Sequence, residues 1–182
     1  MNRVLHLALA VTAASIAGHA TLAAQRARFG VGGGLIAPLS DYKDGDKAGW
    51  QVAANVEFAI PLSPVGIRVD GLYGQTAHRN PVEGKTKLVG GLVSMVYEIP
   101  VPAPMVKPYL LAGGGFYNVK ITLSNAVPPE TSESKFAYGG GAGVNLGVGP
   151  VHLFAEGRYV SVRTSVKTTF SPLTVGVTLG SK

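Results

Sequence analysis

The sequence has 182 residues, no cysteine and a formal net charge of +6 at pH 7. The lack of cysteine excludes a disulfide framework, a thiolate metal site and a lipid anchor attached to cysteine. The 25 glycines are about twice the average usage. They argue against a helical fold, because each glycine inside a helix costs roughly 1 kcal/mol relative to alanine.

Residues 1–24 have the features of a secretory signal peptide. Arg3 supplies a positive charge, residues 4–16 form an apolar stretch, and small residues follow up to Ala24. We predict cleavage after Ala24, with Ala20 as an alternative, and a single domain over residues 25–182. The apolar stretch is too short for a membrane-spanning helix.

The rest of the chain repeats a unit of alternating apolar and small or polar residues followed by a break. Short breaks alternate with long polar ones. The short breaks are residues 61–65, 100–106 and 149–150, and the long ones are residues 40–49, 77–86, 121–135 and 163–168. This arrangement predicts an all-β fold, an eight-stranded antiparallel up-and-down transmembrane β-barrel with short periplasmic turns and long external loops.

Each predicted strand has one apolar face, which a membrane barrel turns toward lipid. In the stretch 50–60, for example, Trp50, Val52 and Phe58 share one face, and Gln51 and Glu57 share the other. The opposite faces are rich in glycine with a few charges, which suits a narrow filled lumen. The predicted lumen polar network is Asn55, Glu57, Arg68, Asp70, Glu98, Asn145, Glu156 and Arg158.

If residues 61–64 form a tight turn, Glu57 lies opposite Arg68 and Asn55 lies opposite Asp70. Buried carboxylates and guanidiniums stay charged only when they are paired. We therefore predict a polar plug, to which the bulky residues Leu72, Leu110, Phe116 and Phe154 add volume. The alternative is a narrow ion pathway gated by the Glu57 and Arg68 pair.

Aromatic spacing predicts two girdles on the outer face. Trp50 and Phe58 are eight residues apart, as are Tyr109 and Tyr117, and Tyr159 shares the predicted lipid-facing parity. Eight residues of a tilted strand rise by about 20 Å. This is close to the roughly 25 Å height of the apolar band of a membrane barrel.

Motifs for other chemistry are weak. The stretch Gly84-Lys85-Thr86 ends like a phosphate-binding loop but lacks the upstream glycine. His78 and His152 are far in sequence from other plausible ligands. We expect no metal and no cofactor.

Three consecutive segments carry a family resemblance: KPYLLAGGGFY at 107–117, FAYGGGAGVN at 136–145 and FAEGRY at 154–159. Together they resemble the eight-stranded outer-membrane β-barrel domain shared by the OmpA transmembrane domain, OmpX-like proteins and neisserial opacity proteins. The likeness extends roughly over residues 26–180, and it implies that Glu156 and Arg158 are inner charged residues. The chain departs from the family at its end, where Leu179-Gly180-Ser181-Lys182 replaces the usual terminal aromatic residue.

The function that we expect is that of an exported, integral protein of the cell outer membrane, with a structural or surface-interaction role and no catalysis. Its expected partners are the lipid bilayer, lipopolysaccharide and surface ligands of the four loops, with no nucleic acid, and we expect a monomer. One alternative is a small-pore, porin-like channel. Another is an outer-leaflet enzyme that modifies lipid A acyl chains through Ser40, Asp41 and His78, although their spacing matches no known type.

Overall fold

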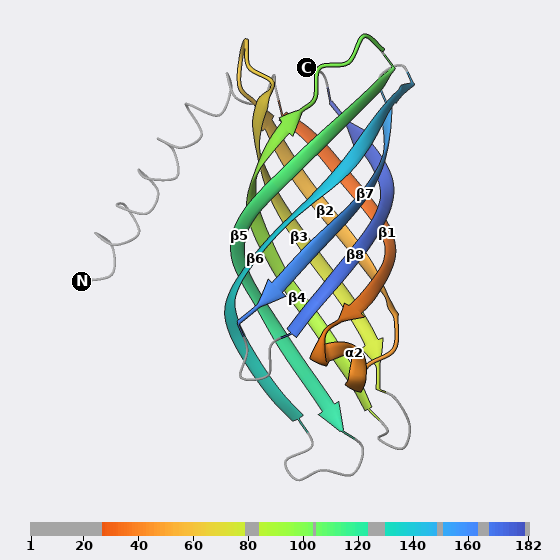
Figure 1. Ribbon diagram of the computed structural model, residues 1–182, viewed down its shortest axis with the longest axis vertical. Helices are drawn as coiled ribbons and strands as arrows, with labels where there is room; N and C mark the ends of the chain where they lie inside the picture. Colours follow the sequence, from red (N-terminus) through yellow and green to blue (C-terminus); the bar gives the residue numbers. More distant parts are fainter. Residues whose placement is uncertain are drawn as a thin grey trace, which may run out of the picture.

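The structure, a computed structural model, describes residues 27–78, 84–103, 105–123, 130–148, 151–163 and 168–180. The predicted signal peptide lies outside the described residues. Eight strands and one short helix follow each other along the chain (Figure 1). They are β1 (Ala27–Leu39), α2 (Asp41–Gly45), β2 (Gly49–Ala59), β3 (Val65–Ala77), β4 (Gly84–Glu98), β5 (Val106–Leu123), β6 (Glu130–Val148), β7 (Val151–Val162) and β8 (Thr168–Leu179).

The strands form one closed antiparallel barrel in sequence order, and β1 closes it by pairing with β8. This confirms the predicted eight-stranded up-and-down fold. One end, the short-turn end, carries the connections of residues 60–64 and 99–105. The opposite end, the long-loop end, carries α2, the end of β5 at Leu123 and the start of β6 at Glu130 (Figure 1). None of the described helical segments has the length and hydropathy needed to cross a membrane.

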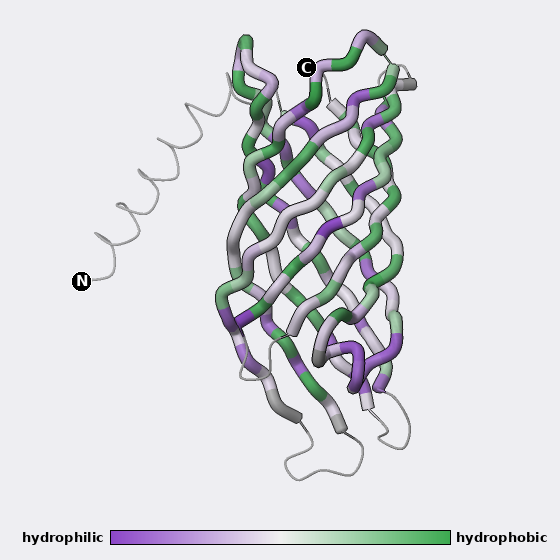
Figure 2. The backbone as a smooth tube through the Cα atoms, in the orientation of Figure 1, coloured by the Kyte–Doolittle hydropathy of each residue, from purple (hydrophilic) through white to green (hydrophobic). Residues whose placement is uncertain are grey.

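Apolar and small or polar residues alternate along the strands (Figure 2). The exposed fractions of the side chains show that the apolar set faces outward. The faces predicted for the stretch 50–60 are those observed in β2. The β2–β3 register pairs Glu57 with Arg68 and Asn55 with Asp70 as predicted. The outward apolar side chains include Phe29, Val31, Leu35, Trp50, Val52, Phe58, Ile67, Val69, Val89, Val93, Met95, Leu153, Tyr159, Leu173, Val175 and Leu179.

The orientation predicted for the fifth strand is wrong. Tyr109 and Tyr117 are only 1% and 3% exposed inside the barrel, whereas Leu110 and Phe116 are 49% and 67% exposed outside. The two tyrosines are therefore not girdle residues, and Leu110 and Phe116 do not fill the lumen. Both faces of this strand are apolar, so its alternation does not fix which one points outward.

Glycines on neighbouring strands explain why the interior accepts these two tyrosines. Tyr109 lies opposite Gly143 of β6, and Tyr117 lies opposite Gly90 of β4. A Cβ atom added at either glycine would collide with the tyrosine ring. The glycine-rich strands thus provide space for large inward side chains on β5.

The long loop predicted over residues 121–135 is also wrong. β5 continues to Leu123 and β6 begins at Glu130, with pairing from Tyr117 and Lys135 to Thr122 and Glu130. This part of the hairpin extends beyond the barrel in Figure 1. Strands that lie there need no apolar face, so both faces carry polar residues. The alternation of apolar and polar residues that identifies a strand is therefore missing from the sequence of this part. Two of the other predicted long breaks also differ, since α2 occupies part of 40–49 and β4 begins at Gly84 rather than after residue 86. The connections 60–64 and 99–105 have the lengths predicted for 61–65 and 100–106. Residues 79–83, 149–150 and 164–167 lie outside the described residues.

Candidate functional site

The interior of the barrel near its short-turn end contains one continuous series of ion pairs. Four carboxylates and three arginines from β1, β2, β3, β4 and β7 alternate along it. In order of contact, they are Glu98, Arg28, Glu57, Arg68, Glu156, Arg158 and Asp70. Every charge of the series thus has an opposite neighbour, in an environment where a lone charge would be very costly.

Arg68 is the centre of this network. Its Nη2 atom lies 2.7 Å from Oε2 of Glu57, and its Nη1 atom lies 2.7 Å from Oε2 of Glu156. The guanidinium is 4.9 Å from the centroid of the Tyr109 ring. The Tyr109 hydroxyl donates a hydrogen bond of 2.8 Å to Glu156. The tyrosine expected to face lipid is therefore part of the polar network.

Arg28 extends the network toward the short-turn end. It contacts Glu57 and lies 2.8 Å from Glu98, which is the more accessible of the two carboxylates. A cavity of about 20 Å³ lies here between the turn at Ser63 and Pro64 and the two carboxylates. The sequence places Arg28 among the inner-face charges, and the register of β1 and β2 makes it the partner of Glu57.

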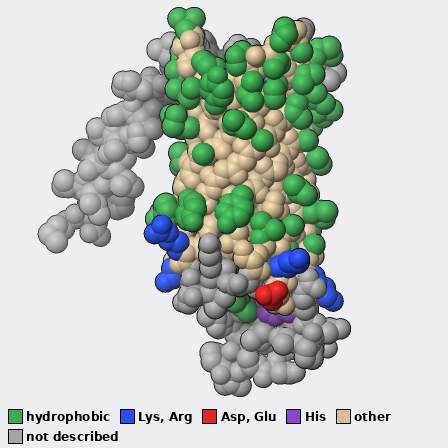
Figure 3. Space-filling view, in the orientation of Figure 1, with side chains coloured by type: hydrophobic (Ala, Val, Ile, Leu, Met, Phe, Trp, Pro, Cys, Tyr) green, Lys and Arg blue, Asp and Glu red, His purple; other side chains and the backbone are tan. Residues whose placement is uncertain are grey.

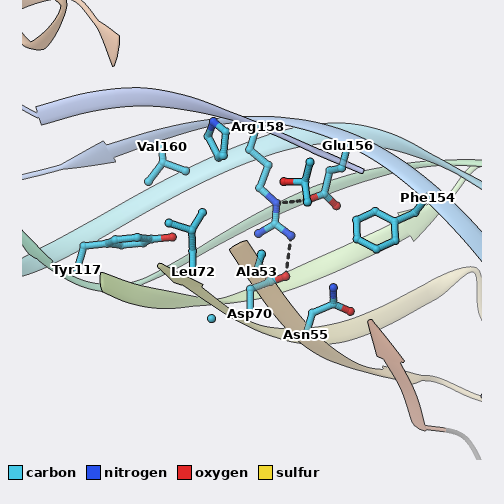
Figure 4. Close-up of a pocket in the computed structure, with 12 residues that line it drawn as sticks. Ala53, Asn55, Asp70, Leu72, Tyr117, Phe154, Glu156, Arg158 and Val160 are labelled. Atoms are coloured by element: carbon cyan, nitrogen blue, oxygen red, sulfur yellow. Dashed lines mark hydrogen bonds and ion pairs between the residues drawn. The ribbon is translucent and has the colours of Figure 1, made fainter. Parts of the chain in front are cut away.

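Arg158 ends the network on the other side. It contacts Glu156, and its Nη2 atom lies 2.6 Å from Oδ1 of Asp70 (Figure 4). A second cavity of about 20 Å³ adjoins these groups and is also lined by Asn55 and Tyr117. A space of this size holds a single water molecule. Each of the two cavities therefore has room for about one water beside the ion pairs.

Two predicted members of the network lie inside the barrel without joining the ion pairs. Asn55 lines the cavity beside Asp70. Asn145 is buried on β6, and within the described ranges no ion pair or hydrogen bond of the network includes its side chain. Of the eight residues predicted for the lumen polar network, six thus form ion pairs, and Asn55 and Asn145 are polar residues of the barrel interior outside these pairs.

Between the charged layer and the long-loop end, the lumen contains a layer of apolar side chains. The buried residues of this layer pack as one cluster, with Leu72 against it. They are Ile36, Tyr42, Leu88, Leu92, Tyr117, Val119, Ala137, Val160, Val162 and Phe170. Tyr117 and Phe170 meet edge to face with ring centroids 5.6 Å apart. Of the residues in this layer, the sequence predicts only Leu72 in the lumen, because apolar strand faces are expected to meet lipid.

Helix α2 closes the long-loop end through a polar contact set around Asp46. Thr76 and Thr86 donate hydrogen bonds of 2.9 and 3.2 Å to the Asp46 carboxylate. Tyr42 of α2 lies 2.6 Å from the Thr76 hydroxyl, and His78 Nε2 lies 3.7 Å from Asp46. Burial raises the pKa of Asp46, while the hydrogen bond from Thr76 and the nearby His78 oppose this shift.

The side chain of Asp46 is expected to anchor α2. Replacing Asp46 with alanine leaves the buried hydroxyls of Thr76 and Thr86 without their acceptor, so we expect a local loss of about 1–3 kcal/mol. Hydrogen exchange of the α2 amides and of the Lys47 amide, which bonds to Ala77, measures this loss. Asp44, exposed on the same helix, is the matched control. Equal exchange rates in D46A and D44A would contradict the anchoring role.

The arrangement around His78 does not match the acyl-modifying alternative. Among the described residues, His78 contacts Asp46 and the Thr86 hydroxyl, 3.0 Å away, and both contacts are made by the same ring nitrogen, Nε2. A triad requires the carboxylate on one ring nitrogen and the nucleophile on the other. The Asp41 side chain lies outside the described part of the structure. The described residues also include no group of histidine, aspartate and glutamate suited to hold a metal ion.

Of the residues predicted for the girdles, Trp50, Phe58 and Tyr159 are exposed on the outer face. Two further aromatic pairs lie on the same face. Trp50 meets Tyr73 with centroids 5.6 Å apart, and Phe116 meets Phe136 edge to face at 5.8 Å. These pairs join neighbouring strands, a feature that the spacing within one strand does not reveal.

Comparisons with known proteins agree with this architecture. A sequence model described as "Outer membrane protein beta-barrel domain" matches residues 6–180. This match includes almost the whole chain, which therefore belongs to the outer-membrane β-barrel family. No curated protein matches the chain.

Solved structures share the fold at low sequence identity. Neisserial surface protein A is 20% identical, with a TM-score of 0.66 over 85% of this chain and 97% of that chain. Ail, the attachment invasion locus protein of Yersinia pestis, is 15% identical, with a TM-score of 0.56 over 84% of this chain and 96% of that chain. A major outer membrane protein from Thermus thermophilus is 14% identical, with a TM-score of 0.51 over 84% and 98% of the two chains.

Proposed function

We propose that this chain is an integral, non-catalytic protein of the cell outer membrane, whose sealed barrel anchors a surface-exposed hairpin. Residues 1–24 direct its export, and residues 25–182 form the barrel domain. The short turns then lie in the periplasm and the long-loop end lies outside the cell, as in other barrels of this type. Its role is structural or that of a surface contact.

The outer face supports a membrane location. Large apolar side chains are exposed on every side of the barrel, at a density that water-soluble proteins avoid. In Figure 3 these side chains gather in bands toward both ends of the barrel, and Lys and Arg side chains lie beyond the lower band. On β3 and β4, the outward positions Gly71 and Gly91 are partners and add no side chain to the outer face.

The filled lumen is the observation that supports a barrel that does not conduct ions. Ion pairs around Arg68 occupy the half toward the short-turn end, and the apolar cluster around Phe170 occupies the other half. A channel needs a continuous water path, whereas the cavities here each hold about one water. The Glu57 and Arg68 pair is therefore a structural element of the plug rather than a gate.

The surface-contact role is supported by the β5–β6 hairpin. Residues 130–135 of β6 pair with β5 on one side. On the other side, pairing with β7 begins at Ala137, so the described part of the chain provides no second neighbour for this stretch. An exposed strand edge offers backbone groups to an extended partner. This edge, rather than four irregular loops, is the surface that we expect ligands to meet.

Planar bilayers that contain lipopolysaccharide test the proposal. The purified protein is expected to show at most rare, small conductance steps and to leave the acyl chains of lipid A unchanged. Steady large single-channel currents would contradict the sealed lumen. Loss of an acyl chain that depends on His78 would contradict the non-catalytic role.

A further inference from the structure

The pairing of β7 with β8 is interrupted at one place within the barrel wall. The pairs continue from the short-turn end as far as Gly157 and Leu173, and they resume at Val160 and Phe170. The register is the same on both sides of this gap, so no residue is inserted there as in a β-bulge. Among the described pairs of the other seven neighbouring strands, none is interrupted in this way.

Pro172 of β8 explains the gap. Proline has no N–H group, so it cannot donate a hydrogen bond to a neighbouring strand. Pro172 keeps its pairing with Ile36 of β1, so the missing donor faces Arg158 of β7. Within sheets, proline is otherwise found at edges, bulges and strand starts, whereas Pro172 is fully buried in a closed wall. The β7–β8 pairing therefore has a weak point at this level.

Side-chain contacts across the outer face of the gap are also small. Gly157 has no side chain to set against its partner Leu173, and the short side chain of Ser171 lies at the register position opposite Tyr159. Directly opposed side chains contribute about 0.2–1 kcal/mol relative to a pair of alanines, and a glycine adds nothing of this kind. The outward side chains therefore do not compensate for the lost backbone hydrogen bond.

The gap separates a polar cavity inside the barrel from an apolar depression outside it. Arg158 and Pro172 line the inner cavity, which has room for about one water. The outer depression has a volume of about 500 Å³, and Leu173 is part of its wall. Glu156 and Thr174, which are partners in β7 and β8, line both spaces. The wall between the two spaces is thus formed by β7 and β8 themselves.

The inner cavity contains a hydrogen-bond acceptor that no described group satisfies. Asp70 uses its Oδ1 atom to bind Arg158, 2.6 Å away, whereas its Oδ2 atom is buried without a hydrogen-bond partner among the described residues. Asn55 lines the same cavity. A molecule that reaches this cavity can therefore donate a hydrogen bond to Asp70.

We propose that β7 and β8 separate locally around Pro172, and that the opening connects the inner cavity sideways with the apolar part of the membrane. Local opening starts where backbone hydrogen bonds and side-chain contacts are fewest. The ion pairs of Arg68 and the layer around Phe170 close the lumen along its axis, so the opening gives access to Asp70 from the side without an axial channel. The proposed function supplies only the membrane outside the opening, whereas the opening is a property of the folded barrel itself.

Relaxation dispersion of the backbone amide nitrogens in the purified, folded barrel tests the opening. In wild type, exchange on the microsecond to millisecond timescale is expected on both sides of the gap, at residues 157–160 and 170–173. P172A supplies the missing N–H group. Since one hydrogen bond contributes about 1 kcal/mol, the open population and its contribution to relaxation are expected to fall roughly fivefold. P108A is the matched control, because Pro108 of β5 keeps its partner Val144, and it is expected to leave exchange at the gap unchanged.

A disulfide across the gap tests the same opening without a change at Pro172. Tyr159 and Ser171 lie at opposed register positions, and the sequence has no cysteine, so Y159C/S171C forms one defined bridge. The oxidised form is expected to lose the exchange at the gap, and the reduced form is expected to keep it. Dissolved oxygen, a small paramagnetic molecule that concentrates among acyl chains, probes the sideways connection in lipid nanodiscs. It is expected to relax the Asn55 side-chain amide more strongly in the reduced form.

Unchanged exchange in P172A or in the oxidised double variant, or its absence from the gap in wild type, would overturn the opening. Equal relaxation by oxygen in the reduced and oxidised forms would overturn the sideways connection. Recovery of the protein from the soluble fraction of cells would instead contradict the proposed function, and the exchange measurements do not depend on that result.

Discussion

Replacing Glu57 with arginine is expected to lower the free energy of unfolding by about 3–5 kcal/mol, the usual effect of breaking a buried ion pair. Glu57 lies between Arg28 and Arg68 and contacts both. The substitution therefore brings three guanidinium groups together in an enclosed space. Equilibrium urea unfolding in lipid vesicles measures the loss.

Adding R68E to E57R is expected to restore only part of this stability. In the double variant the carboxylate introduced at position 68 faces Glu156, and the guanidinium introduced at position 57 faces Arg28, so one favourable contact is regained and two unfavourable contacts remain. The exposed Asp44 of α2 supplies the control, since D44R makes the same charge change outside the lumen. If E57R unfolds at the same urea concentration as D44R and wild type, the network does not stabilise the barrel.

Replacing Phe170 with alanine is expected to cost about 3–5 kcal/mol, as in the core of a water-soluble protein. Phe170 is fully buried inside the barrel and packs against Tyr117. Its removal leaves a cavity in the apolar half of the lumen, because the strand backbone is held by pairing on both sides and cannot close around it. Urea unfolding is again the measurement.

The variant F170L refills most of this volume and is expected to lose less than half as much stability as F170A. Such a graded response is characteristic of tight packing. Wild-type stability in F170A would mean that water, rather than packed side chains, fills this half of the lumen. It would also remove the main reason to expect a non-conducting barrel.

The strand count and the inward position of Glu57 and Arg68 could be predicted because each depends on local pattern. Period-two alternation identifies strands, and a tight turn fixes the register of the strands that it joins. The short turn before Val65 thus places Glu57 opposite Arg68 without further information. The same counting does not identify Arg28 as a partner, because the β1–β2 connection includes a helix.

The remaining features depend on contacts between distant strands. The inward position of Tyr109 and Tyr117 is set by glycines on β6 and β4, and a one-residue change of parity exchanges every side chain between the faces. In the sequence, the apolar residues of the layer around Phe170 cannot be distinguished from apolar residues that face lipid. The polar extension of β5 and β6 resembles a loop, because strands outside a membrane need no apolar face.

Separation of the membranes of the native cell, followed by detection of the protein in each fraction, tests the central claim most directly. We expect the mature protein in the outer membrane, where it resists extraction by high salt and by carbonate because its exposed face is apolar on every side of the barrel. Recovery in the soluble periplasmic fraction would contradict a membrane-spanning barrel.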